Sequence, residues 1–566
     1  MSAGGRLDPI DVAIAWDRLI SIADEGAAAL VRTSFSTLVR EGFDLTVMLF
    51  DAAGRMLAQS TKCIPVFIGT APVTMAHMLA KYPPDALRPG DIVVSNDATI
   101  GTGHMFDVAL MRPVFREDAL IGFAMSVTHL PDIGGMGFSA AATEIFHEGL
   151  RIPIWKLADA GRLDQNLIDL IRLNVRVPEQ VIGDIMANVS AVEVAGRQLL
   201  QFMAEAGLER LDGLADAILT QTERAAREAL SAIPDGTYEN ALDVEAYDEV
   251  RRLACLIEKA GDGVAIDFEG TGPCVRAGIN VPFPYTKSMA LYTLKCVAMP
   301  RLPNNDGATA PIRVSAPVGS ILHAMPPAPS AGRHAIGHFI TPLIFGALAE
   351  AVPDRVSAGS GLINILTLQG RHRDGRPLAA TYFAAGGFGA LSDLDGRPTM
   401  PGSSNMGSTP TEIFEPLSGL VVERKALLPD SGGAGRFRGG PGQEIVLRND
   451  TGQPMVVFSM ANRTEFPARG LDGGRPGGLR QHLVNGRAIP SQGRWELAPG
   501  DRLTMREAGG AGFGDPRLRP AEAVADDIRR GFTTPAAASR EYGFPSPAQP
   551  ASHDAIPTRP KEPTSR

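Results

Sequence analysis

"DVALMRPVFREDALIGFAMSVTH", residues 107–129, holds two apolar stretches on either side of the charged turn "REDA". This pattern predicts an antiparallel β-hairpin. If the turn centres near residue 118, the numbers of opposed residues add to about 236. Asp107 and His129 meet this condition, so their side chains should lie beside each other at the open end of the hairpin. His104 lies in the preceding loop, where two glycines permit tight backbone turns.

Two histidines and a carboxylate on one scaffold suit a divalent metal ion. Neutral imidazole with carboxylate, and coordination positions left open, favour Zn, Mn or Fe. Asp44 begins the strand predicted in "DLTVMLF" and is a possible fourth ligand. Other interpretations stay open at this point, because an isolated H-x-x-D is common in polar loops. A carboxylate such as Asp44 is also common as a turn or cap residue.

The composition indicates a globular protein with more than one packed unit. The 566 residues exceed what one hydrophobic core usually holds, and 44% of them are hydrophobic. The formal net charge of −9 argues against a nucleic-acid binder. The longest nearly apolar run is too short for a bilayer and contains Glu350. The four cysteines have no CxxC spacing, so we expect a soluble protein of the reducing cytoplasm with no membrane partner.

Helix and strand patterns alternate along the chain and predict an α+β fold with several sheets and long helical segments. A helix is expected over 9–39, and a hairpin over 43–59 has "DAAG" as its turn. The patterns divide the chain into an N-terminal metal-binding part of about 1–160, a helical part of about 161–232, a β-rich part of about 233–516, a C-terminal helical segment over 517–544 and a disordered tail over 545–566.

The stretch "AGRHAIGH" contains three further side chains of interest. Arg333 is suited to bind an anionic substrate group in a bidentate manner, and equally suited to a structural salt bridge. His334 and His338 lie four residues apart on a predicted helix face. Without a nearby acid, we expect them on the surface or in the core rather than at a second metal site.

Longer stretches give the chain a family resemblance. "NDATIGTGHMFDVALMRPVF" and "GFAMSVTHLPDIGGMG" resemble the hydantoinase B family. That family includes the B subunits of N-methylhydantoinase and caprolactamase, the metal subunits of acetone and acetophenone carboxylases, and the C-terminal half of 5-oxoprolinase. The similarity extends from Asp44 to Pro516 through "PNNDGATAPIRVSAPVGSIL", "PAPSAGRHAIGHFI", "STPTEIFE", "DSGGAGRFRGGPG" and "GGAGFGDP".

The resemblance implies that residues 1–516 form one catalytic region with a multi-sheet, hydantoinase-B-like fold. It also implies an A-type partner subunit that uses ATP. The chain itself contains no P-loop sequence, which agrees with ATP use through that partner. The ligands that the resemblance implies for one divalent metal ion are Asp44, His104, Asp107 and His129.

Three positions depart from the family pattern, and none of them is an implied ligand. Gly103 precedes the first histidine in place of threonine, and Ala98 replaces the proline of the N-D-P motif. Leu130 replaces the second histidine of A-H-H. The loss of this histidine bears on the substrate more than on the metal, because it removes a group that supports or supplements the ligands.

We therefore expect the metal-containing B-type component of an ATP-dependent cyclic-amide hydrolase. With its A-type partner it would form a hetero-oligomer and open hydantoin, lactam or imide rings. Asp132 is expected to orient the attacking water or accept its proton, although it equally suits a turn before two glycines. The second candidate is the metal subunit of a ketone carboxylase of the acetone or acetophenone type. The third is a non-catalytic subunit that stabilises the partner and holds a structural metal.

Overall fold

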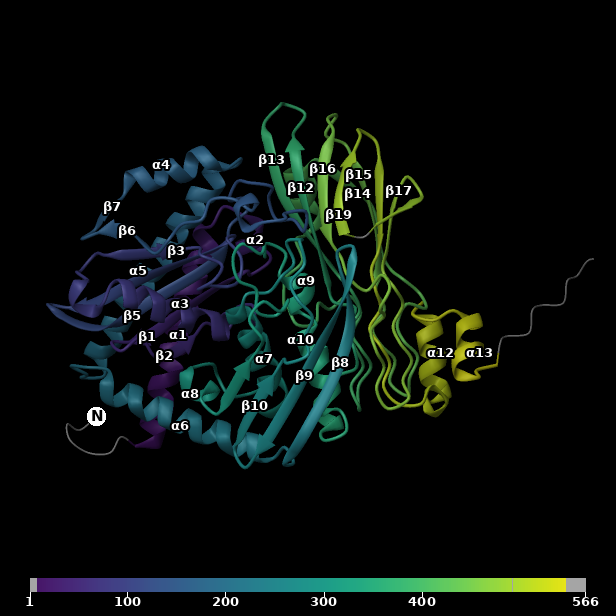
Figure 1. Cartoon of the computed structure of the whole chain (residues 1–566), viewed down its shortest axis with the longest axis horizontal. Coiled ribbons are helices and arrows are strands. Elements are labelled where there is room, and N and C mark those ends of the chain that lie inside the picture. The colour runs from purple at the N-terminus through teal and green to yellow at the C-terminus, as the bar shows by residue number, and fades with distance from the viewer. Residues whose placement is uncertain (1–7, 491, 546–566) are drawn as a thin grey trace, which may run out of the picture.

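A computed structural model describes residues 8–490 and 492–545 of the chain (Figure 1). Within these residues, four β-sheets and several long helices alternate along the sequence. This arrangement confirms the expected α+β class. The N-terminal sheet with its helices occupies one side of the molecule, and the last two sheets occupy the opposite side (Figure 1).

Helix α1 (Pro9–Thr33) is shorter than the helix expected over 9–39. It begins where Asp8 caps a backbone N–H and a proline takes the first turn. It ends because the backbone N–H groups of Phe35 and Ser36 donate to the carboxylate of Asp184, at 2.7 and 3.2 Å, from a distant helix. The short helix α2 (Thr37–Arg40) follows this break.

A seven-stranded antiparallel sheet carries the hairpin on which the sequence argument rests. Its spatial order is β2-β1-β5-β4-β3-β6-β7. Helix α3 (Phe67–Lys81) lies between its second and third strands in the sequence. The strands are β1 (Leu45–Asp51), β2 (Met56–Gln59), β3 (Ile92–Ser95), β4 (Asp107–Arg116), β5 (Ala119–His129), β6 (Trp155–Asp159) and β7 (Arg162–Leu163).

The register of the β4–β5 hairpin is the predicted one. Asp107 pairs with His129 at the open end, and the pairing continues toward the turn until a bulge between Val114 and Phe115. Strand β1 adds to the other edge of β5, and the backbone N–H of His129 donates to the carbonyl of Asp44 at 3.2 Å. The sheet therefore brings Asp44, Asp107 and His129 to one end.

Three helices lie in the part of the chain expected to be helical, namely α4 (Gln165–Asn174), α5 (Pro178–Glu205) and α6 (Asp212–Ser231). Helix α5 packs against α1 and against strands β4 and β5. Its Asn188 donates to the hydroxyl of Thr128 at 2.7 Å within the buried contact. Helix α5 thus covers one face of the β4–β5 hairpin and holds it in place close to its open end.

The second sheet has the order β11-β10-β9-β8, and only its β10–β11 pair is parallel among its pairs of described strands. Helix α7 packs against α3, α10 and α9, so it joins this region to the first sheet. The elements are β8 (Gly236–Ala246), β9 (Glu249–Ala260), β10 (Gly263–Asp267), α7 (Phe283–Ala298), α8 (Asp306–Thr309), β11 (Ile312–Ser315), α9 (His334–Gly337) and α10 (Ile340–Leu348).

The third and fourth sheets pack together through one shared core, which contains Leu366, Tyr382, Ile445 and Met505. The third sheet has the order β13-β12-β16-β19, and the fourth has the order β14-β15-β20-β17-β18. Their elements are β12 (Ile363–Arg371), β13 (Pro377–Ala385), α11 (Thr411–Ser418), β14 (Leu420–Leu427), β15 (Gln443–Asn449), β16 (Met455–Met460), β17 (Gln481–Val484), β18 (Arg487–Ile489), β19 (Gln492–Leu497) and β20 (Arg502–Arg506).

Glycine-rich extended segments continue from these two sheets toward helix α12 (Figure 1). Their backbones are close enough that a Cβ atom on Gly387 would lie 1.8 Å from the carbonyl oxygen of Gly440. Gly440 N–H donates to the carbonyl of Phe388, and Gly510 N–H donates to Gly440. The high glycine content of this region therefore serves close backbone packing.

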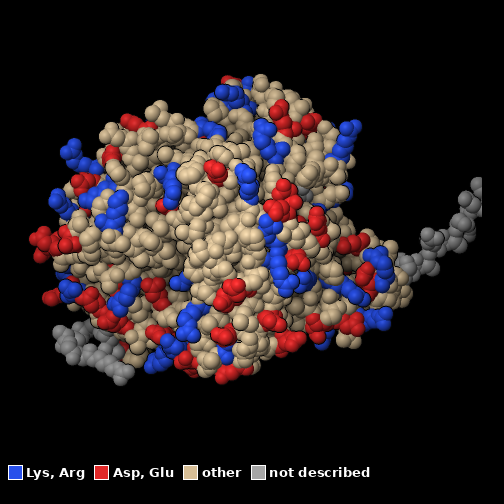
Figure 2. Space-filling view, in the orientation of Figure 1, with Lys and Arg blue, Asp and Glu red and all other residues tan. Residues whose placement is uncertain are grey.

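Two short helices, α12 (Ala521–Arg529) and α13 (Pro535–Tyr542), lie in the C-terminal segment expected to be helical. The tail expected to be disordered lies outside the described residues from position 546 onward. No helix in the described part of the chain has the length and hydropathy needed to cross a membrane. Basic and acidic side chains are interspersed over the face shown in Figure 2.

Candidate metal centre

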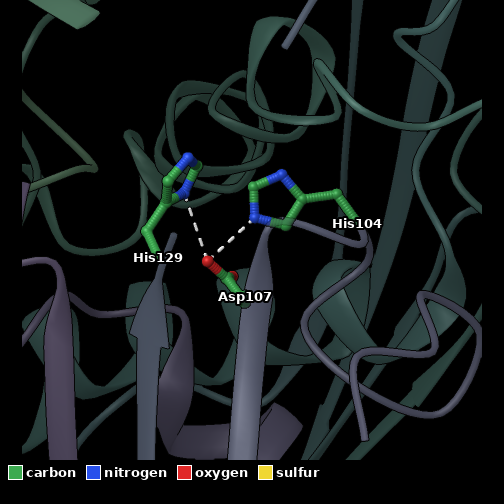
Figure 3. A group of neighbouring side chains, drawn as sticks. All are labelled: His104, Asp107 and His129. Carbon is green, nitrogen blue, oxygen red and sulfur yellow. Dashed lines mark ion pairs between the residues drawn. The ribbon is translucent and has the colours of Figure 1, made fainter. Parts of the chain in front are cut away.

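Three of the four implied ligands come together at the open end of the hairpin. Asp107 and His129 are the facing ends of β4 and β5, and His104 comes from the loop before β4 (Figure 3). Gly103 has a φ of +89°, and a Cβ atom there would lie 2.9 Å from the Cδ atom of Arg333. Glycine at this position therefore lets the His104 loop turn tightly against the arginine.

The three side chains direct their ligand atoms at one point. His104 Nε2 lies 2.9 Å from Asp107 Oδ1, and His129 Nδ1 lies 3.2 Å from the same oxygen (Figure 3). All three residues are at least 95% buried. In the described part of the chain, they form the one group of three or more such side chains whose ligand atoms all lie within 4.8 Å of one another.

The donor set fits a divalent transition metal ion. His104 Nε2 and Asp107 Oδ1 are buried and close, yet neither has a hydrogen-bond partner within the described residues. Two ligand atoms that share one ion at about 2.1 Å are themselves roughly 3.0–3.4 Å apart, from octahedral to tetrahedral angles, and the observed distances of 2.9 and 3.2 Å are close to this range. Burial, followed by the Arg333 guanidinium, lowers the pKa of His104 to about 3. Its imidazole is therefore neutral, as a metal ligand must be.

Asp44 lies at the edge of this group. Its Oδ2 atom is 3.5 Å from His129 Nδ1, and its Oδ1 atom is buried without a hydrogen-bond partner among the described residues. Burial raises the pKa of Asp44 to about 7. The charge of Asp107 adds to this upward shift, and His129 acts against it. A nearby positive ion favours the ionised form of such a carboxyl group. The position of Asp44 is compatible with a fourth ligand that completes its contact when the ion binds.

Arg333 faces the ligands from the start of helix α9. Its Nη2 atom donates to Asp107 Oδ2 at 2.9 Å, its Nε atom donates to the carbonyl of Thr102 at 2.5 Å, and its guanidinium lies over the ring of Tyr285. Of its two expected roles, the salt bridge is formed. His104 and this arginine outweigh the effect of burial and hold the pKa of Asp107 well below its usual value. Arg333 therefore keeps the central ligand ionised.

A cavity of about 40 Å³ adjoins the ligands. His334 and His338 line it, so this pair, expected on the surface or in the core, is buried beside the candidate metal centre. The i, i+4 spacing indicates that the two histidines share a helix face. No local feature of the sequence indicates that this face lines the cavity. The lining residues are Asp44, Ile64, Pro65, Val66, His129, Phe138, Tyr285, Met289, Arg333, His334, His338, Ile365, Phe383, Ser403, Ser404 and Met406.

Asp132 lies outside this cavity lining. Its Oδ1 atom pairs with Arg176 Nη1 at 2.8 Å and accepts a 3.1 Å hydrogen bond from the backbone N–H of Gly134. Its Oδ2 atom accepts from the backbone N–H of Arg176. These contacts match the alternative role of Asp132 as a turn residue. The catalytic role expected for it stays a prediction, and its position argues against that role.

Glu148 supports the candidate metal centre from behind, and sequence reasoning did not identify it. Its Oε1 atom accepts hydrogen bonds from the backbone N–H groups of Ser330 and Ala331, both at 2.6 Å. The carbonyl oxygen of Ala331 lies 3.0 Å from Nδ1 of His104. The buried carboxyl group thus holds the segment that orients a predicted ligand.

A larger pocket, of about 660 Å³, lies between the β8–β9 turn and strand β17. None of the four predicted ligands lines it. We assign the chemistry to the smaller cavity, because the ligand atoms without partners converge there and not at the larger pocket.

Comparisons with known proteins agree with the resemblance seen in the sequence. The chain is 28% identical to the putative B-type component of a D-/L-hydantoinase from Pseudomonas sp. (strain NS671), over 95% of both proteins. The crystal structure of the ATP-dependent caprolactamase from Pseudomonas jessenii superposes with a TM-score of 0.87 at 26% identity, over 95% of this chain and 96% of that one. The nucleotide-free structure of acetone carboxylase superposes with a TM-score of 0.86 at 22% identity, over 95% of this chain and 79% of that one. The family model described as hydantoinase B/oxoprolinase matches residues 8–516, and the chain therefore belongs to the hydantoinase B/oxoprolinase family.

Proposed function

We propose that the chain is the metal-containing subunit of an ATP-dependent enzyme that hydrolyses a cyclic amide, such as a hydantoin, lactam or imide. The observation that carries the proposal is the convergence of His104, Asp107 and His129 beside a small cavity, in a chain of this family. In this proposal the ligands are these three residues and Asp44, and the ion is Zn, Mn or Fe.

The bound ion would act as a Lewis acid toward the carbonyl group and as a means of activating water. The protein side chains hold the geometry that this chemistry needs. Asp107 stays ionised beside Arg333, and His104 stays neutral in its buried position. Arg333 is also the one guanidinium that lines the cavity within the described residues, so we propose that it positions the polar end of the substrate as well.

ATP use belongs to a second subunit in this proposal. The relative from Pseudomonas sp. is itself named as one component of a hydantoinase, and the solved caprolactamase is described as ATP-dependent. The full sequence contains no P-loop. An A-type partner would bind ATP and activate the carbonyl oxygen, and this chain would complete the ring opening.

Hydrolysis is favoured over ketone carboxylation by the extent of the match. The chain spans 96% of the caprolactamase chain but 79% of the acetone carboxylase chain. At 22% identity, the second match supports a common fold and no more.

The proposal is tested by purifying the chain together with an A-type partner subunit. ATP turnover is then measured with hydantoins, lactams and imides, and with acetone and acetophenone in the presence and absence of bicarbonate. We expect ring opening coupled to ATP hydrolysis, and its loss after a chelator removes the metal. ATP turnover that requires both a ketone and bicarbonate would replace hydrolysis with carboxylation. Full activity of the metal-free complex would instead indicate a structural metal.

A further inference from the structure

Two histidines that are not predicted ligands face the cavity beside the metal centre. His334 opens helix α9 and His338 follows its end, so one turn separates them, and their ring centroids are 5.7 Å apart. The exposed fractions of the two residues are 4% and 5%. The ring centroids of His334 and Phe138 are 5.4 Å apart. The rings of His104 and His129 contact the same phenyl group. The pair therefore lies close to the ligands without belonging to them.

Three of the four ring nitrogens of this pair have no hydrogen-bond partner within the described residues. His334 Nδ1, His334 Nε2 and His338 Nδ1 are buried and make no hydrogen bond within the described residues. Buried polar atoms in native proteins are nearly always hydrogen-bonded, so three such atoms at one cavity indicate that a polar molecule occupies it. Burial, with Arg333 as a further cause, lowers the pKa of His338 to about 3. Burial, and after it His338 and Arg333, also lowers the pKa of His334. Both rings are therefore neutral and present a lone pair to the cavity.

The size of the cavity fits water. Its volume is about 40 Å³, and a water molecule needs at least about 10–15 Å³ of such space and two to four polar partners. The two histidines and Asp44 line the cavity and supply those partners. A substrate ring is larger, so the ring stays outside this space and only its polar end reaches Arg333, while the water stays within the cavity.

We propose that His334 and His338 hold the attacking water and that His334 accepts its proton. This inference rests on the proposed function. As the water oxygen forms a bond to the carbonyl carbon, one O–H bond breaks and its proton moves to a ring nitrogen of His334. The same proton then passes to the ring nitrogen of the amide as the C–N bond breaks. One water molecule is thereby added across the C–N bond, and His334 returns to its neutral form.

His334 is assigned the proton rather than His338 because both of its nitrogens lack partners among the described residues. One nitrogen can accept a hydrogen bond from the water while the other donates. A second metal ion at this pair is the competing interpretation of the i, i+4 spacing. A metal site needs a third ligand, such as a carboxylate, close to both histidines. The described residues place none there, so we favour water.

The inference is tested with His334→Gln and His338→Gln in the complex with the partner subunit. His77→Gln is the matched control, because His77 is an exposed histidine on helix α3. We expect His334→Gln to lower kcat by about 10²–10⁴-fold, the usual contribution of general base catalysis, with KM changed less than about threefold. Metal content and the midpoint of thermal unfolding should match the control. If His334→Gln does not fold, His334→Asn takes its place.

A second readout does not depend on turnover. A crystal structure of the metal-loaded chain should show an ordered water within about 3.2 Å of a His334 ring nitrogen. Wild-type kcat in His334→Gln, a metal ion bound between the two histidines, or protein groups bonded to both His334 nitrogens would overturn the inference. A wild-type complex that opens no cyclic amide would instead overturn the proposed function, and the assigned proton transfer with it.

Discussion

The Nδ1 atom of His104 has two neighbours that make different demands on its proton. It lies 3.0 Å from the carbonyl oxygen of Ala331 and 2.9 Å from Nη1 of Arg333. A histidine that binds a metal through Nε2 keeps its hydrogen on Nδ1, where it usually donates to a carbonyl or carboxylate group. The contact with Ala331 suits that tautomer. The contact with Arg333, which is always a donor, does not, so we favour the bond to Ala331 as the one that orients the ring.

Glu148 should make stability depend on pH. Burial raises its pKa to about 8, against the opposing effect of the N–H groups of Ala331 and Ser330. A carboxyl group with a raised pKa binds its proton more tightly in the folded state, so its contribution to stability is lost as pH rises from about 4.5 toward 8. Glu148→Gln keeps an acceptor for both N–H groups and cannot ionise. The midpoint of thermal unfolding should therefore fall less between pH 5 and 8 in Glu148→Gln than in the wild type. Parallel curves for the two proteins would show that Glu148 is ionised throughout.

The β4–β5 hairpin is the element whose geometry could be predicted most fully from the sequence. Two apolar stretches and a short charged turn determine an antiparallel register, and that register brings Asp107 to His129. Arg333 and His334 could not be placed in this way. They reach the cavity from the start of helix α9, more than 200 residues beyond Asp107, and tertiary packing such as that of α7 against α3, α10 and α9 brings them there.

A substitution at Gly122 in strand β5 would test how closely β5 must pack against β1. A Cβ atom there would lie 2.3 Å from the carbonyl oxygen of Phe50 in β1, and a backbone atom cannot move aside cheaply. Gly122→Ala should therefore cost roughly 1–3 kcal/mol, as overpacking usually does. Gly263→Ala is the matched change, since Gly263 also lies in a strand and its Cβ atom would be 3.6 Å from the nearest atom. The midpoint of thermal unfolding should be lowered in Gly122→Ala and unchanged in Gly263→Ala. Equal midpoints would mean that β1 and β5 separate without cost.

At the scale of the molecule, a buried ion-pair network ties the C-terminal helices to the glycine-rich segments. Arg519 pairs with Asp395 and with Asp527, both at 2.7 Å, and Arg438 pairs with Asp527 at 3.2 Å. Arg519→Met leaves two carboxylates to one arginine and should cost about 3–5 kcal/mol. Arg517→Met, two residues away and exposed, should leave the thermal midpoint unchanged. Equal stability of the two variants would show that α12 and α13 are held by other contacts.

The overall α+β class followed from the alternation of helix and strand patterns, but the layered glycine segments did not. Glycine-rich sequence such as "GGAGRFRGGPG" indicates turns, whereas here Gly433 N–H donates to the carbonyl of Gly510 and Gly440 N–H donates to the carbonyl of Phe388. The hydrogen-bond partners of these glycines come from stretches far apart in the sequence, so composition alone could not identify the arrangement. The break after α1 has the same origin, because the N–H of Phe35, just past the C-cap residue Ser34, donates to Asp184 on a distant helix.

The central claim is that His104, Asp107 and His129 bind one metal ion. The most direct measurement is the metal content per chain, by elemental mass spectrometry, of protein supplied with Zn, Mn and Fe. We expect about one ion per chain in the wild type, as the single ligand group implies, and in His77→Ala. His104→Ala and His129→Ala should each contain almost none. Retention of the ion by both variants, or a wild-type protein that binds no metal, would contradict the account.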